Sequence, residues 1–315
     1  MIFIHKKYYI CLRILIMKIT TNLMNDIAHA PEWFHEAINQ KPQEKILDHI
    51  DGNISYAFWK AKTNSDSLIV LVHGTGAHKK WWYPVGPKLN HKAHVIAIDL
   101  PGMGDSDFRE KYKVEDFGSC VTNVIKAEKD NHNINYVYLV GHSLGGHVAG
   151  YVGTEEKNLI NGLMIVDTFI RPPNYDNSEH KKNGPLRMIK FYEDKEKLLQ
   201  RFRLMPKQDC ENDWYLRYIA EHSIKQTKDG WRWKFDDRMF TGLERLFGYK
   251  FSFECPASFV HGENSLLTSG KLLENAKLAY SDRMKFINMP GSAHHVPLDK
   301  PGELIDLILS ESGLL

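Results

Sequence analysis

Short apolar runs recur along the chain and alternate with longer segments whose apolar positions have the spacing of a helix. The run Leu68–Val72 contains five consecutive apolar residues, which predicts a strand buried on both faces of a sheet. Further strands are predicted at Val95–Ile98, Tyr136–Val140, Leu163–Val166 and Ala257–Val260, with an edge strand at Met284–Ile287. This alternation is typical of a mainly parallel sheet covered by helices.

Turn residues and helical spacing predict the remaining elements. Lys45–Ile50 and Ile54–Trp59 are joined by Asp51-Gly52-Asn53, which predicts an antiparallel hairpin. Helices are expected near Val114–Lys129, Leu144–Val152, Gly270–Ala279 and Pro301–Leu309. The proline of the last helix stands in its first turn, where a missing backbone N–H costs little.

One stretch of the chain breaks this alternation. Between Thr168 and Tyr249 the sequence contains no convincing buried strand. It contains charged helical patterns and then a run of aromatic residues: Arg187–Arg203, Trp214–Ile224, Trp231, Trp233 and Phe235. An insertion of about 80 residues is too long for a plain loop, so we predict a helical subdomain.

The N-terminal segment has some features of an export signal. Lys6 and Lys7 would form its basic part, and Ala28-His29-Ala30 its cleavage site. Arg13 interrupts the apolar part, however, and the segment is too short and too charged to span a bilayer. We therefore expect residues 1–30 to be an extension outside the core. Met17 and Met24 are alternative start positions.

Composition and charge argue against several classes of partner and cofactor. A net charge of +2 and a pI near 8.2 favour neither nucleic acid nor an acidic membrane surface as a partner. The cysteines are scattered, without metal-ligand spacing, which is typical of reduced thiols in a cytoplasmic protein: Cys11, Cys120, Cys210 and Cys255. No phosphate loop or nucleotide motif occurs, so we expect no cofactor and no metal.

The strongest candidate for chemistry is Gly141-His142-Ser143-Leu144-Gly145, which follows a predicted strand and precedes a predicted helix. This is the G-x-S-x-G pattern in its strand–turn–helix context. The turn is so sharp that side chains at the glycine positions would collide with neighbouring elements. It exposes the Ser143 hydroxyl, and the helix N-terminus offers N–H groups to a developing oxyanion. The alternative is an ordinary tight turn with an exposed serine.

Two further loops follow predicted strands. His73-Gly74-Thr75-Gly76 comes after Leu68–Val72, where its glycines could simply end the strand. Pro290–Val296 comes after the edge strand and contains His294 and His295. A serine nucleophile needs a general base, and the chain order Ser…Asp/Glu…His places that base on a late loop.

With these motifs in this order, the chain resembles the α/β-hydrolases from about Pro31 to its end. Asp99–Ser106 also looks like this family's turn after the fourth strand. The resemblance implies an α/β-hydrolase fold: a mostly parallel eight-stranded sheet, helices on both faces and a helical cap inserted after the sixth strand. We therefore expect the core at residues 31–168 and 250–315, and the cap at 169–249.

The resemblance also implies roles for individual residues. Ser143 stands at the nucleophile position and His294 at the position of the general base, with His295 as its rival one residue later. The backbone N–H groups of Thr75 and Leu144 would form the oxyanion hole. Ala293 departs from the family, which commonly has glycine before the histidine.

The acid is open between two carboxylates. Many relatives carry it after the seventh strand in the pattern G-x-x-D, but this chain reads His261-Gly262-Glu263-Asn264-Ser265, with Ser265 at the aspartate position. Other relatives carry it after the sixth strand, where Asp167 stands here. Either Asp167 or Glu263 could hold the histidine tautomer. We expect Asp167 to be the acid and keep Glu263 as the alternative.

A serine nucleophile argues against the related dehalogenases and epoxide hydrolases, which use an aspartate. We expect hydrolysis of a carboxylic ester of a small to medium acyl substrate. One alternative is a C–C bond hydrolase of diketone-like substrates, whose members commonly have tryptophan where His295 stands. Others are a non-catalytic ligand-binding member of the fold and a membrane-acting lipase. Aromatic residues are candidates for the pocket wall or the cap core: Trp81, Trp82, Trp214, Trp231, Trp233 and Phe235.

Overall fold

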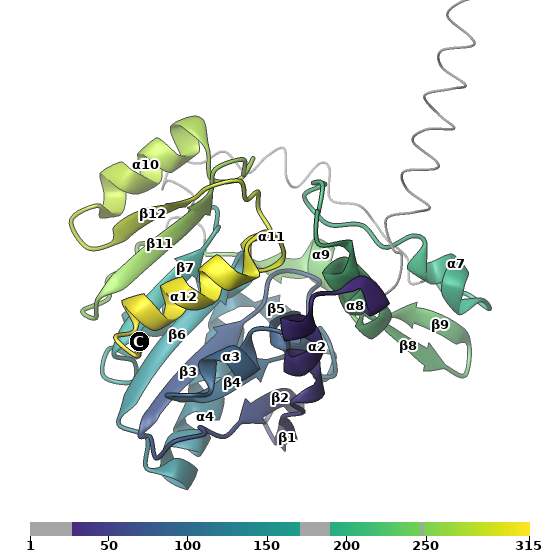
Figure 1. Cartoon of the computed structure of the whole chain (residues 1–315), viewed down its shortest axis with the longest axis horizontal. Coiled ribbons are helices and arrows are strands. Elements are labelled where there is room, and N and C mark those ends of the chain that lie inside the picture. The colour runs from purple at the N-terminus through teal and green to yellow at the C-terminus, as the bar shows by residue number, and fades with distance from the viewer. Residues whose placement is uncertain (1–26, 171–189, 247–248) are drawn as a thin grey trace, which may run out of the picture.

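The computed structural model describes residues 27–170, 190–246 and 249–315, which are arranged around one central sheet (Figure 1). The sheet has 8 strands in the order β1-β2-β4-β3-β6-β7-β11-β12. In chain order these are β1 (Gln43–Leu47), β2 (Ile54–Trp59), β3 (Ser67–Val72), β4 (His94–Ile98), β6 (Tyr136–His142), β7 (Gly162–Val166), β11 (Ala257–Gly262) and β12 (Lys285–Met289). β2 pairs antiparallel with β1 and β4, and the other pairs are parallel. The predicted mostly parallel sheet and its edge strand are confirmed.

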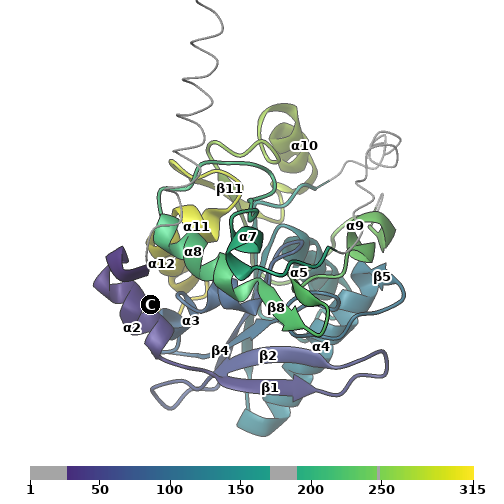
Figure 2. The ribbon, with the colours of Figure 1, turned by 90° about the vertical axis from the view of Figure 1, so that its right-hand side faces the viewer.

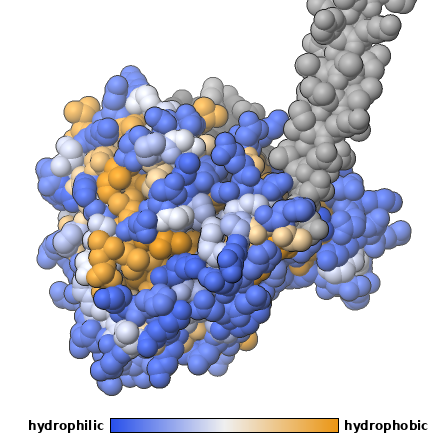
Figure 3. Space-filling view, viewed as in Figure 1, coloured by the Kyte–Doolittle hydropathy of each residue, from blue (hydrophilic) through white to orange (hydrophobic). Residues whose placement is uncertain are grey.

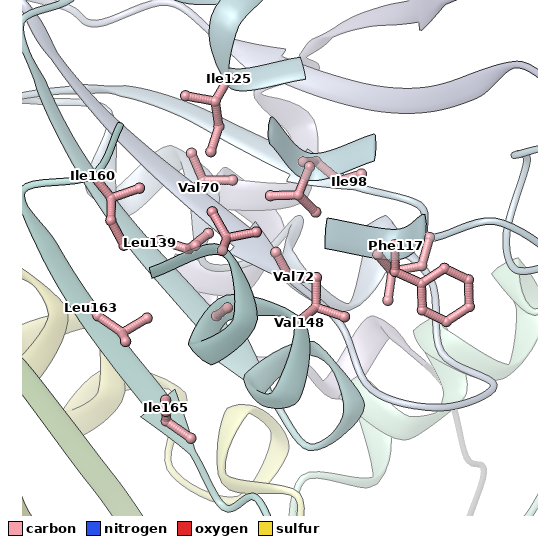
Figure 4. Packing of buried hydrophobic residues seen from close by; sticks show 14 of the residues in the cluster. Val70, Val72, Ile98, Phe117, Ile125, Leu139, Val148, Ile160, Leu163 and Ile165 are labelled. Carbon is pink, nitrogen blue, oxygen red and sulfur yellow. The ribbon is translucent and has the colours of Figure 1, made fainter. Parts of the chain in front are cut away.

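Helices cover both faces of this sheet. The helices that pack on the sheet are α2 (Glu32–Asn39), α3 (Gly86–Leu89), α4 (Val114–His132), α5 (Leu144–Glu155), α10 (Gly270–Tyr280) and α12 (Pro301–Glu311). Alternate residues of β3 show why the strand is apolar after Ser67. Val70 and Val72 pack with α4 and α5, as Figure 4 shows, whereas Ile69 and Leu71 pack in the second cluster with α3 and α12.

The chain between β7 and β11 is mixed rather than helical, which corrects the sequence prediction. Its described elements are α7 (Lys195–Leu199), α8 (Asp213–His222), β8 (Ile224–Thr227), β9 (Gly230–Trp233), α9 (Arg238–Gly242) and β10 (Leu243–Glu244). Of these elements, α7, α8, β8 and α9 lie on the side of the molecule that faces the viewer in Figure 2. β8 and β9 form an antiparallel hairpin, while β10 pairs with β5 (Tyr112–Lys113). The hairpin forms because Gly230 accepts a φ of +118° at the turn.

The predicted helices of this insertion are shorter than expected. The helical pattern at Trp214–Ile224 is α8, which ends at His222 before β8 begins. Of the pattern at Arg187–Arg203, only Lys195–Leu199 is helical in the described part, and residues 187–189 lie outside it.

Residues 1–26 also lie outside the described residues, together with the alternative starts at Met17 and Met24 and most of the signal-like segment. The described end of the expected extension makes core contacts, because Ala30 is buried and Ile27 packs against the same cluster. Within the described ranges, no helix is long and apolar enough to cross a membrane.

The face seen in Figure 1 is largely hydrophilic in the space-filling view, with apolar patches around α12 (Figure 3). Leu307 and Leu309 of this helix and Leu314 beyond it are only partly buried against the core.

Candidate active site

Ser143 occupies a strained turn between β6 and α5. Its backbone has φ 55° and ψ −115°, an unusual combination for a residue with a side chain. The flanking glycines make this turn possible, because a Cβ on Gly141 would meet the backbone carbonyl oxygen of Gly145. A Cβ on Gly145 would meet that of Val72. The turn therefore leaves the Ser143 hydroxyl projecting beyond the carboxyl end of β6.

His294 lies within hydrogen-bond distance of both Ser143 and Asp167. Its Nε2 is 3.1 Å from Ser143 Oγ, and its Nδ1 is 2.8 Å from Asp167 Oδ1. Since an ionised carboxylate only accepts, Nδ1 carries the proton, and Nε2 is left to accept from the Ser143 hydroxyl. Both His294 and Asp167 are buried. The structure thus brings together Ser143, His294 and Asp167 from three separate loops.

Asp167 directly follows β7 and is surrounded by donors. Besides His294, its carboxylate accepts hydrogen bonds from the backbone N–H of Gly262 and from the hydroxyls of Ser265 and Thr268, each at 2.7 Å. Sequence reasoning noted Ser265 only as the replacement of an expected aspartate, and it missed Thr268. Their role becomes visible only when the acid is placed on β7 beside this loop.

Glu263 lies elsewhere. It is exposed, and its carboxylate accepts a hydrogen bond from the backbone N–H of Gly291 at 2.9 Å. The carboxylate beside His294 is that of Asp167. The geometry therefore favours Asp167 over Glu263 as the partner of the base.

The neighbouring histidines are buried and neutral. Burial lowers the pKa of His142 to about 3, and its Nε2 donates to the backbone carbonyl of His294. Burial also lowers the pKa of His295 well below its usual value, with His294 and His142 adding to the effect. The His295 ring packs against His294 and Trp81, and the Ser143 hydrogen bond belongs to His294. His142 thus helps to fix the loop that carries His294.

The expected oxyanion donors lie on segments that flank Ser143. Leu144 is the first residue of α5. Gly74 precedes Thr75 and lies so close to the serine that a Cβ built on it would be 3.0 Å from Ser143 Cβ. His73 fixes this loop: its Nδ1 donates to the Gly74 carbonyl at 2.7 Å, and its Nε2 accepts from the backbone N–H of Leu100. Burial lowers the pKa of His73, which keeps it neutral and able to accept that bond.

The aromatic residues proposed for the pocket wall lie in three places. Trp81 and Trp82 are buried in the core cluster that also holds Tyr215 of α8, whose hydroxyl donates to the Trp81 carbonyl. Trp214, Trp231 and Trp233 pack within or beneath the insertion. Phe235 lies beside the oxyanion loop, 3.9 Å from a Cβ built on Gly76. Of these aromatic residues, Phe235 is thus the one that lies beside the glycines of the loop after β3.

In the described part of the chain, three histidines lie close enough to share a metal ion: ligand atoms of His142, His294 and His295 are within 4.8 Å of one another. The nitrogens of His294 and Nε2 of His142 are already hydrogen-bonded. Both ring nitrogens of His294 are therefore already used by Ser143 and Asp167.

Comparison with known proteins places this geometry in context. A family model described as "Alpha/beta hydrolase family" matches residues 69–307. A pimeloyl-[acyl-carrier protein] methyl ester esterase of Neisseria meningitidis is 29% identical over 112 residues, 36% of this chain and 41% of that protein. Monoacylglycerol lipase abhd6-A of Xenopus laevis is 26% identical over 119 residues, 36% of this chain and 34% of that protein. The chain thus spans between a third and a half of the length of these relatives.

Solved structures extend the likeness over most of the chain. The thioesterase domain from the curacin biosynthetic pathway has a TM-score of 0.68 and 22% identity, covering 85% of this chain and 99% of that one. E-2-(acetamidomethylene)succinate hydrolase has a TM-score of 0.69 and 20% identity, and the match covers 85% of this chain and 97% of that one. At these identities the likeness shows the fold.

Proposed function

The chain belongs to the alpha/beta hydrolase family, and from this premise we propose that it hydrolyses a carboxylic ester of a small to medium acyl group. The observation that carries the proposal is the hydrogen-bonded series from Ser143 Oγ to His294 Nε2 and from His294 Nδ1 to Asp167. A weak nucleophile beside a base that a third group orients is the arrangement of nucleophilic catalysis. The esterases among the relatives support an ester as the substrate.

In the acylation step, Ser143 Oγ attacks the ester carbonyl carbon while its proton passes to His294 Nε2. Asp167 stabilises the imidazolium that results, and the backbone N–H groups of Thr75 and Leu144 stabilise the oxyanion. The tetrahedral intermediate then expels the alkoxide, which takes the proton from His294 and leaves as the alcohol. The acyl group remains on Ser143.

In the deacylation step, water attacks the acyl-enzyme and His294 again accepts a proton. The second tetrahedral intermediate releases the carboxylic acid and returns the proton to Ser143. No external cofactor is required by this sequence of proton transfers.

In this proposal residues 169–249 act as the cap, of which 169–170, 190–246 and 249 belong to the described residues. Two polar contacts support its placement over the loops of the site: His78 Nε2 lies 2.9 Å from Ser223 Oγ, and the Gln208 side chain accepts from the backbone N–H of His295. The substrate then binds between the sheet and the cap, near Phe235.

The first test is Ser143→Ala. We expect the fold to remain and turnover of p-nitrophenyl esters to fall on the order of 10⁶-fold, because the nucleophile is lost. An acyl chain-length series measured with the wild type should give a burst of p-nitrophenol, and a fluorophosphonate should label Ser143.

Two outcomes would contradict the proposal. Labelling that persists in Ser143→Ala would place the nucleophile elsewhere. A wild type that neither turns over esters nor reacts with the fluorophosphonate would be a non-catalytic ligand-binding member of the family.

A further inference from the structure

The end of β11 and the loop that follows it supply three of the four neutral donors to the carboxylate of Asp167. Oδ1 accepts from Ser265 Oγ at 2.7 Å and from His294 Nδ1 at 2.8 Å. Oδ2 accepts from Thr268 Oγ1 and from the backbone N–H of Gly262, both at 2.7 Å. Each oxygen therefore has two donors, which is the full capacity of an ionised carboxylate.

The hydroxyl donors matter because this carboxylate is completely removed from water. Asp167 is 0% exposed, while Ser265 and Thr268 are 1% and 3% exposed. Among the described residues, none of the hydrogen bonds to Asp167 comes from lysine or arginine. A buried carboxylate without a cationic partner depends on hydrogen bonds to replace the water that it has lost.

The same donors fix the direction of the side chain. Asp167 has a φ of 41°, an uncommon conformation for a residue with a side chain. Rotation of its carboxylate would break the bonds from Ser265 and Thr268 together. As long as they hold, Oδ1 faces His294 Nδ1, and the other ring nitrogen faces Ser143.

We propose that Ser265 and Thr268 are positioning residues, which hold the Asp167 carboxylate in place and directed at His294. This inference rests on the proposed function. Ser265 stands where many α/β-hydrolases carry the acid itself. In this chain that position supplies a hydroxyl to an acid on the neighbouring parallel strand, since β7 and β11 pair directly with Val166 opposite Val260.

A purely structural role is the competing explanation. Ser265 Oγ also accepts from the backbone N–H of Leu267 at 3.2 Å, so it shapes the turn as well. A structural role predicts that loss of either hydroxyl lowers the melting temperature alone. A positioning role predicts that kcat falls while KM stays the same. The reason is that the hydrogen bond from His294 Nδ1 to Asp167 strengthens when His294 becomes charged during the reaction.

The sharpest comparison uses two variants of Thr268. Thr268→Val keeps the shape and removes the hydroxyl, whereas Thr268→Ser keeps the hydroxyl. We expect kcat on a p-nitrophenyl ester to fall about tenfold in Thr268→Val and in Ser265→Ala, and about 10²-fold in the double variant. These losses are below the roughly 10⁴-fold that follows when the histidine tautomer is wrong. Thr268→Ser should stay within about twofold of the wild type.

Ser258→Ala provides the matched control. Like Ser265 and Thr268, Ser258 is a buried residue whose hydroxyl donates to a carboxylate, here that of Glu311. It stands near the start of β11, at the opposite end of the strand from the loop that carries Ser265 and Thr268. Ser258→Ala should leave kcat and the rate of fluorophosphonate labelling unchanged.

Proton NMR gives a readout that does not require turnover. The His294 Nδ1–H resonance should move in Thr268→Val and Ser265→Ala, and stay in place in Thr268→Ser and Ser258→Ala. Unchanged kcat and an unchanged resonance in Thr268→Val and Ser265→Ala would overturn the inference, as would equal losses in Thr268→Val and Thr268→Ser. A wild type without esterase or fluorophosphonate reactivity would defeat the proposed function, and the resonance would still decide the role of the hydroxyls.

Discussion

Two of the three proposed catalytic residues have a positive φ, 55° at Ser143 and 41° at Asp167. Such conformations cost roughly 1–3 kcal/mol each and persist where the surroundings impose them. Here the surroundings are neighbouring strands. The backbone N–H of Ser143 donates to the Val166 carbonyl, and that of Asp167 donates to the Val260 carbonyl. The strain therefore lies where the side chains must leave the sheet.

Asp167→Asn tests the role of the acid at this scale. Asparagine tolerates positive φ, so we expect the fold to remain. The amide favours the wrong tautomer of His294, and kcat should fall by roughly 10³–10⁴-fold. Glu263→Gln is the matched control, because glutamine can still accept from the backbone N–H of Gly291; its loss should be under about tenfold. Steady-state kinetics on one ester decides, and the reverse ranking would transfer the acid role to Glu263.

At the scale of elements, the site follows from the strand order. β6, β7, β11 and β12 are consecutive parallel neighbours, so their carboxyl ends lie along one edge of the sheet. The loops after β6, β7 and β12 carry Ser143, Asp167 and His294, and the loop after β11 carries Ser265 and Thr268. Residues far apart in the sequence thus meet without any long excursion of the chain.

Gly141 and Gly145 form the sharp turn around Ser143, which we call the elbow. Replacing Gly145 tests how closely this turn packs against the neighbouring strands. In Gly145→Ala, the new Cβ would meet the backbone carbonyl of Val72 in β3, which cannot move aside. We expect a loss of several kcal/mol in the free energy of unfolding, or failure to fold, as for other overpacked sites. Urea unfolding measures it.

Gly153→Ala is the control on the same helix, α5. Its Cβ would lie 3.3 Å from Ile160 Cδ1, the end of a flexible side chain, and alanine is the better helix former. It should change the free energy of unfolding by less than about 1 kcal/mol. Equal effects of the two substitutions would show that the elbow does not need its glycine.

The elements predicted correctly are those whose burial leaves a pattern in the sequence. β3 is apolar from Leu68 to Val72 because both of its faces are covered, and that run predicted its position. The hairpin of β8 and β9 was missed because its strands are short and half-exposed, although Asp229-Gly230 is a turn signal that could have revealed it. The hydroxyls of Ser265 and Thr268 could not be assigned, because their partner depends on the register between β7 and β11.

At the scale of the whole molecule, ion pairs connect the insertion to the core. Lys79 is buried and contacts Asp99 and Asp105 at 2.8 and 2.9 Å, and Asp105 also meets Lys234 of the insertion. Burial alone lowers the pKa of Lys79, but the two aspartates outweigh it and raise that pKa above its usual value. The cluster therefore stays charged at neutral pH.

Unlike Lys79, which stays charged when buried, several buried histidines are neutral in the folded state. Burial lowers the pKa of His142 to about 3. Burial also lowers the pKa of His78 well below its usual value. The neighbours His73, Lys234 and His222 lower the pKa of His78 further, while Asp105 raises it. The unfolded chain protonates such residues near pH 6.5. Their contribution to stability is therefore fully present above about pH 6.5, and it is lost progressively as the pH falls toward the folded-state pKa.

His78→Gln tests this linkage. Each histidine that is neutral when folded and protonated when unfolded makes the free energy of unfolding fall by about 1.4 kcal/mol per pH unit below about pH 6. Glutamine cannot titrate but can still bond Ser223, the present partner of the His78 ring. Urea unfolding followed by tryptophan fluorescence between about pH 5 and pH 6 should give a slope smaller by about 1.4 kcal/mol per pH unit than in the wild type. His91→Gln, at an exposed position, should leave the slope unchanged. If His78→Gln keeps the wild-type slope, then His78 is protonated in the folded protein, and the acid sensitivity arises from other groups.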